Sequence, residues 1–236
     1  MHNLLLLIPV LTIAEPLYKI NKMKIVSLIF FLNLTFFSFS QNRINKTISK
    51  QTLDSIKNTI IEKDSLAVDM RIKLFDEIMP KHGRNSDEFA KVREILIKKD
   101  SLTSNYLKSI VLKYGWLGKS QIGEEANDIA YVMLLHSSIQ NQVELLPYLF
   151  YSCSISESNW EGYAWVMDRV LIAKGHKQIY GKEAQQDPVT KLWEIYPVAD
   201  AKNINKRRLK LGLLPIEESA KKRGISIKKL YNKVYK

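Results

Sequence analysis

The segment DRVLIAKGHKQIYG, residues 168–181, decides the fold because it contains the point at which a helical pattern gives way to an extended one. Apolar residues recur at helical spacing over Glu161–Lys174, and Gly175 is a natural stop for that helix. After the glycine, the pieces GHKQIYG and TKLWEIYPV read as short extended segments joined by a polar turn. The pattern therefore predicts a helix followed by a small β-hairpin near residues 177–197.

Helical periodicity dominates the rest of the chain. Apolar residues recur at three- and four-residue steps between Thr47 and Leu112, and Pro80 and Gly83 interrupt them. Further helices are predicted over residues 86–96, 102–113, 124–137 and 143–153, and in an interrupted stretch from residue 201 onward. The sequence therefore predicts a mainly α fold, a single helical domain with a small two-stranded β-hairpin near residues 177–197.

Composition narrows the class of protein. The chain has 236 residues, of which 46% are hydrophobic and 25% charged, which is typical of a globular protein and excludes a fully disordered one. Its single cysteine, Cys153, excludes a disulfide framework within the chain, and we predict neither a cofactor nor a metal site. The net charge of +12 favours an anionic small molecule or an envelope component as partner.

The first forty residues predict export. Their two apolar runs, Leu4–Ala14 and Ile25–Phe39, are shorter than the roughly 20 residues of a membrane-spanning helix. From Met23 onward, MKIVSLIFFLNLTFFSFSQ has the basic start, the apolar stretch and the small residues of a secretory signal, with cleavage predicted after Ser40. Residues 1–40 would then be an upstream extension and signal peptide, and residues 41–236 a periplasmic or secreted domain without a spanning helix. An uncleaved membrane anchor is the alternative.

Basic charge remains after this removal. The forty residues contain three lysines and one glutamate, so the remainder still has a net charge of +10. The positive charge therefore belongs to the predicted domain itself.

Four pieces of the sequence resemble one bacterial family. They are Gly115–Trp116, a helix ending at His136, the block 168–181, and INKRRLKLGLLPI at residues 204–216. In this order they are similar to a domain of unknown function, number 6624 in its series, over about residues 100–218. The resemblance implies a largely helical, often exported protein with no established activity. This chain has Leu135, Lys182 and Glu183 where the family usually has Gln, Ser or Thr, and Gln, so a family site here would be altered.

Five polar residues form the candidate site. His136 is the candidate general acid or base, because its unperturbed pKa of about 6.5 allows proton exchange near neutrality. Asp168 would orient the imidazole, and Arg169 would bind an anionic group of a ligand. Gln178 and Tyr180 alternate along a predicted strand and so would face the same side, where they would line a ligand pocket with His136. The open alternative is a structural or interaction protein in which this polar cluster only stabilises the fold.

The carboxyl tail supports another hypothesis. Residues 202–236 contain twelve basic residues against only Glu217 and Glu218. The stretch PIEESAKKRGISIKKLYNKV has a helix-turn-helix cadence with Gly224 at the turn, which suggests a nucleic-acid binder. An exported protein meets little nucleic acid, so a basic helical tail packed on the domain is favoured.

Overall fold

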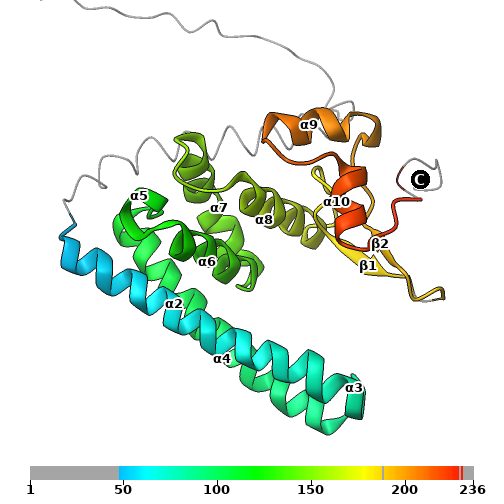
Figure 1. Cartoon of the computed structure of the whole chain (residues 1–236), viewed down its shortest axis with the longest axis horizontal. Helices are drawn as coiled ribbons and strands as arrows, with labels where there is room; N and C mark the ends of the chain where they lie inside the picture. Colours follow the sequence, from blue (N-terminus) through cyan, green and yellow to red (C-terminus); the bar gives the residue numbers. More distant parts are fainter. Residues whose placement is uncertain (1–47, 188, 229, 231–236) are drawn as a thin grey trace, which may run out of the picture. The chain divides into compact units, whose positions relative to one another are not determined.

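A computed structural model describes residues 48–187, 189–228 and 230, all within the compact unit Arg43–Lys236 (Figure 1). The predicted signal peptide lies outside these residues. The longer helices are α2 (Lys50–Ile72), α4 (Asp87–Tyr114), α6 (Glu124–Leu135), α7 (Ile139–Ser154) and α8 (Trp160–Ala173). The shorter ones are α3 (Met79–His82), α5 (Lys119–Ile122), α9 (Ile204–Lys210) and α10 (Ile216–Lys222). Strands β1 (Ala184–Gln186) and β2 (Trp193–Ile195) form the sheet, so the predicted fold class, mainly α with a two-stranded hairpin, is confirmed.

Helices α2 and α4 pack together as a long hairpin (Figure 1). The chain leaves α2 through a π-helical segment, Lys73–Ile78, and α3, and Ser86 caps α4 by accepting from the Phe89 N–H at 3.1 Å. The predicted break between residues 96 and 102 is wrong. No glycine or proline interrupts that stretch, and Asp100 within it forms a 2.6 Å ion pair with Arg71 of α2. The ion pair holds the continuous helix against its neighbour.

The other long helices form the main core. Helix α8 packs against α7 and α6, and α6 also packs against α2 and α4. The contact of α8 with α6 is very close at Gly162, where an added Cβ would lie 2.5 Å from Cγ of Tyr131. A glycine inside a helix is unfavourable by about 1 kcal/mol relative to alanine, and the tight contact accounts for its presence here.

The hairpin follows α8 and its positive-φ stop at Gly175. Strands β1 and β2 are antiparallel, with Gln185 opposite Glu194. Both Gln178 and Tyr180 lie before β1, and only Gln178 pairs with another segment, in an isolated parallel bridge to Val198. The prediction that the two alternate along one strand is therefore wrong. Beyond Gln178, side chains contribute most of the hydrogen bonds that shape the loop.

A third segment lies along the hairpin, where the sequence suggested the turn of a helix-turn-helix; much of the predicted second helix lies outside the described residues. Helix α10 and the turn at Gly224 are present, but residues 225–227 are not helical. Instead, Ser226 pairs with β2: its N–H donates to Trp193 O at 2.7 Å and its carbonyl accepts from the Ile195 N–H at 3.1 Å. The chain turns toward β2 because the apolar side chains of Ile225 and Ile227 pack against the core around Ile195. Most of the tail beyond residue 228 lies outside the described part.

Among the helices that the structure describes, none combines the length and the apolar character needed to cross a membrane.

Candidate functional site

A buried carboxylate shapes the loop between α8 and β1. Asp168 extends from α8 and is fully buried. Its oxygens accept from the backbone N–H groups of Ile179 at 2.8 Å, Tyr180 at 3.0 Å and Lys182 at 2.9 Å. Burial raises the pKa of this carboxyl to about 6, while the backbone hydrogen bonds act in the opposite direction. Asp168 therefore folds residues 179–182 back onto its helix.

Gln178 closes the same loop from within. Its side chain is fully buried. The amide oxygen accepts from the Glu183 N–H at 2.9 Å, and Nε2 donates to the carbonyls of Glu183 at 3.0 Å and Tyr196 at 2.8 Å. The side chain thus joins the two ends of the loop and ties it to the residue after β2.

Two neighbouring arginines of α9 bind the loop carbonyls. Arg207 donates through Nε to Ile179 O at 3.0 Å and through Nη2 to Ala199 O at 2.7 Å. Arg208 is almost completely buried and donates to the carbonyls of Tyr180 and Leu214. Most of this loop's backbone polar groups are therefore satisfied by side chains, as buried backbone requires. The sequence analysis had assigned these arginines no role.

The loop also approaches α9 and α10 very closely. Gly181 has a φ of +72°, and an added Cβ would lie 2.7 Å from Cδ1 of Ile216 and 3.1 Å from Cδ1 of Ile204. Only glycine combines this backbone conformation with this contact.

The five predicted site residues contact different partners in the structure. Arg169 donates through Nη1 to Leu135 O at 2.7 Å and through Nε to Glu183 at 2.9 Å. His136 forms the C-cap of α6 and is exposed; partial desolvation of its ring, followed by the charges of Arg71 and Arg169, lowers its pKa to about 4. The imidazole is therefore neutral at neutral pH.

The contact predicted between Asp168 and His136 is not observed, because in the described chain the Asp168 oxygens accept from backbone N–H groups. Burial raises the pKa of the Tyr180 hydroxyl to about 12. The catalytic assignment of His136 and Asp168 and the ligand-binding assignment of Arg169, Gln178 and Tyr180 stay predictions.

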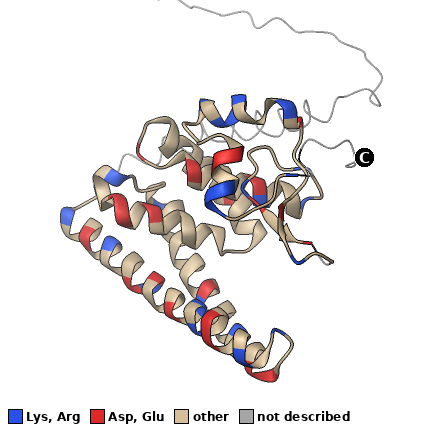
Figure 2. Cartoon of the chain, turned by 45° about the vertical axis from the view of Figure 1, so that its right-hand side comes forward, with Lys and Arg blue, Asp and Glu red and all other residues tan. Residues whose placement is uncertain are grey.

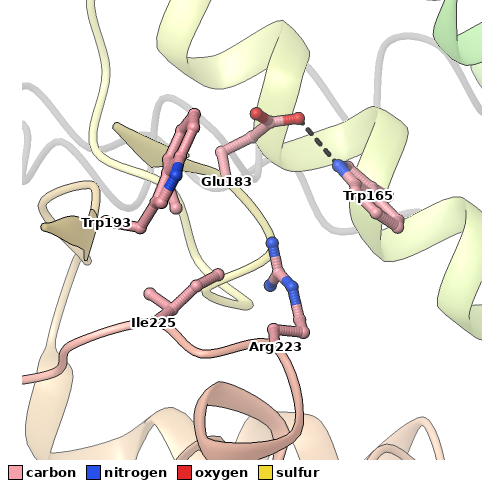
Figure 3. A pocket seen from close by; sticks show the side chains of 6 residues that line it. Trp165, Glu183, Trp193, Arg223 and Ile225 are labelled. Atoms are coloured by element: carbon pink, nitrogen blue, oxygen red, sulfur yellow. Dashed lines mark hydrogen bonds between the residues drawn. The ribbon is translucent and has the colours of Figure 1, made fainter. Parts of the chain in front are cut away.

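A pocket opens beside this loop instead. It has a volume of about 320 Å³ (Figure 3). Its lining consists of Trp165, Glu183, Ala184, Trp193, Arg223 and Ile225. Figure 3 shows the Glu183 carboxylate and the Arg223 guanidinium between the two indoles, with Trp165 Nε1 donating to Glu183 at 2.8 Å. The lining residues come from α8, the hairpin and the segment after α10, so the fold assembles this pocket from distant parts of the chain.

The guanidinium of Arg223 has one terminal nitrogen without a hydrogen-bond partner among the described residues. Its Nη2 donates to Lys182 O at 2.7 Å, and its guanidinium carbon lies 5.3 Å from the centre of the Trp165 ring. Its other terminal nitrogen, Nη1, is buried without a hydrogen-bond partner in the described structure. An unsatisfied buried donor of a charged group is costly and accordingly uncommon.

The other charge that lines the pocket is paired, and so is the neighbouring Lys182. Lys182 is buried and donates to Glu161 at 2.6 Å, and Glu183 forms a 2.8 Å ion pair with Arg169. Among the described residues, Arg223 has no carboxylate within salt-bridge distance. The region therefore has one surplus positive charge, and it lies at the pocket.

Of the residues that line the pocket, only Glu183 stood out in the sequence, as a departure from the family pattern. Trp165 lies in the predicted helix Glu161–Lys174, but its indole was not assigned to a site. Arg223 was counted only as one of many basic residues in the tail. Neither residue lies in a short motif that could have singled it out.

The described chain is thus a helical domain with a small pocket of two indoles, one carboxylate and one guanidinium beside its hairpin. It belongs to the family of unknown function (DUF6624), which matches residues 85–226. The resemblance seen in the sequence is confirmed. The matched region begins next to Ser86, the N-cap of α4, and ends at Ser226, which pairs with β2. No curated protein and no solved structure matches the chain.

The described side chains do not form a metal-binding cluster. Within residues 48–187, 189–228 and 230, no group of three or more His, Cys, Asp or Glu side chains is placed to hold a metal ion.

We predict that Asp168→Ala lowers the free energy of unfolding by about 3–5 kcal/mol, because it leaves several buried N–H groups without an acceptor. Asp168→Asn, which keeps one acceptor oxygen, should cost clearly less. Urea unfolding of both variants would measure this, with Asp76→Ala on the exposed side of the α2–α4 hairpin as the matched control. Equal, small losses for all three variants would contradict the loop-anchoring role.

Proposed function

We propose that the protein binds a small molecule carrying an anionic group in the pocket formed by Trp165, Trp193 and Arg223. The observation that carries this proposal is the buried Nη1 of Arg223, a charged donor without a partner, in a pocket whose other charges are paired. A carboxylate or phosphate oxygen would supply the missing acceptor, since the planar guanidinium fork suits both groups.

The other lining residues indicate the chemical character of the ligand beyond its anionic group. Two indoles, Ala184 and Ile225 provide apolar and aromatic surface, which favours a ring or short apolar group next to the anion. The volume of about 320 Å³ is at the low end of the roughly 300–1,000 Å³ that ligand pockets span. The ligand is therefore small and amphiphilic.

Four polar side chains next to the pocket hold its wall in place. Asp168, Gln178, Arg207 and Arg208 are bonded to backbone groups of the loop that carries Glu183. This favours the fold-stabilising interpretation for those residues and gives the pocket a rigid wall. Binding, rather than a particular reaction, is the function that this geometry supports.

Isothermal titration calorimetry with phenyl phosphate, benzoate and inorganic phosphate tests the proposal, and phenol serves as the neutral control ligand. We expect saturable binding of at least one of the aromatic anions, stronger than that of inorganic phosphate or phenol. Arg223→Gln should weaken it by about tenfold or more, the cost of one charge-assisted hydrogen bond. Arg93→Gln, an exposed site on α4, should leave it unchanged. Absence of saturable binding for all three anions, or equal affinity of Arg223→Gln and the parent protein, would contradict the proposal.

We also infer that the protein is exported. The support is the segment MKIVSLIFFLNLTFFSFSQ, with a basic start, an apolar stretch and small residues before the predicted cut. The mass of the protein recovered from cell fractions tests this: a chain beginning at Gln41 outside the cytoplasm is expected. An intact amino terminus on protein recovered from the cytoplasm would contradict export.

A further inference from the structure

Helix α9 carries basic residues and no acidic one; Asp200, which lies before it, is paired with Arg207 at 3.4 Å. Residues 201–215 contain five lysines and arginines and no acidic residue, and Figure 2 shows this helix in blue and tan at the edge of the described chain. Two of the five, Arg207 and Arg208, point into the protein and donate to backbone carbonyls. The other three are Lys202, Lys206 and Lys210, and all are exposed.

These three lysines have no counter-charge. Within the part of the chain that the structure describes, none of them forms a salt bridge. Lys206 and Lys210 are four residues apart and therefore lie on the same side of α9. The acidic residues Glu217 and Glu218 belong to the next helix, where Glu217 accepts from Asn205 at 2.8 Å and Glu218 pairs with Lys222 at 3.2 Å.

An apolar side chain stands among the lysines. Leu209 is 76% exposed, more than any other large hydrophobic side chain in a described helix, and Leu214 just beyond α9 is 43% exposed. Leu209 follows Lys206 by three residues and Lys210 follows the same lysine by four, so each of these two side chains lies beside Lys206 on the surface of α9. Since Arg208 occupies the inward position, Leu209 is left facing solvent.

We propose that α9 is a peripheral contact with anionic lipid surfaces, in which Lys202, Lys206 and Lys210 bind headgroups and Leu209 enters the apolar boundary. Lysines flanking an exposed leucine fit such a surface, because the long lysine stems reach the headgroups while the apolar side chain leaves water. Nucleic acid fits less well, because a phosphate backbone offers nothing to an exposed leucine. The hydrogen bonds of Arg207 and Arg208 hold the helix in place, so no ordering is needed on contact.

A fluorescent label at the helix tests the proposal in the full-length chain. Leu209→Cys would be labelled with a nitrobenzoxadiazole dye, whose emission increases in an apolar environment. The native Cys153 should stay unlabelled, because it is buried and burial raises the pKa of its thiol to about 12. Leu102→Cys, at a site 67% exposed on α4, is the matched control because it reports adsorption through another surface.

We expect the label at position 209 to brighten with vesicles of phosphatidylcholine and phosphatidylglycerol, and the label at position 102 to stay unchanged. Replacing Lys202, Lys206 and Lys210 by Glu should raise the lipid concentration at half-saturation by at least about tenfold, since each lysine near an anionic surface contributes about fivefold. Circular dichroism would confirm that this variant is folded.

Three results would overturn the proposal. The first is an unchanged label at position 209, and the second is equal brightening at positions 209 and 102. The third is a response to duplex DNA without a response to vesicles, which would assign the helix to nucleic acid.

Discussion

The buried carboxylate of Asp168 is the constraint on which the hairpin side of the molecule depends. An ionised group in such a position is unfavourable unless hydrogen bonds compensate for its lost hydration. Backbone N–H groups of residues 179, 180 and 182 supply that compensation, and the loop adopts the shape that brings them together. At the end of this loop, the Lys182 side chain donates to Glu161, and the Glu183 carboxylate accepts from Trp165 and Arg169. The wall of the pocket is therefore a consequence of one carboxylate on α8.

Three kinds of positive charge coexist near the carboxyl end. Arg207 and Arg208 serve as internal donors to the carbonyls of residues 179 and 180, which form no strand pairing in the described chain. Guanidinium groups suit this task, because they offer several donors in a fixed plane. The lysines of α9 face solvent instead, and Arg223 faces the pocket with one nitrogen unpartnered. The net charge of the chain thus combines structural, surface and pocket contributions that composition alone does not separate.

The fold class was accessible from the sequence because the main signals are local. The apolar face of α8 and the glycine that ends it predicted both the helix and the change to extended structure. Local patterns failed where a distant contact decides the outcome. The chain after α10 follows β2 because apolar side chains pack around Ile195, although its spacing imitates a second helix. Tyr180 resembled a strand residue, but its backbone bonds to Asp168 and Arg208, and Gln178 pairs with the distant Val198 rather than continuing a strand.

The candidate site was less accessible for the same reason. Asp168 and Arg169 were singled out as a pair, yet they serve different partners, because adjacent residues on a helix face different directions. Trp165, Glu183, Trp193 and Arg223 span 59 positions of the sequence, and only the completed fold brings them around one cavity. The burial of Arg208 was also unexpected, since charged residues are usually exposed. The fold explains it, because the guanidinium donates to the carbonyls of Tyr180 and Leu214.

The hairpin side of the molecule depends on the backbone hydrogen bonds of Asp168, and amide hydrogen exchange measures them directly. The amide protons of Ile179, Tyr180 and Lys182 should exchange slowly in the native protein, in step with those of α8, and rapidly in Asp168→Ala. Exchange at these three amides as fast as at the exposed turn of the hairpin in the native protein would contradict the account.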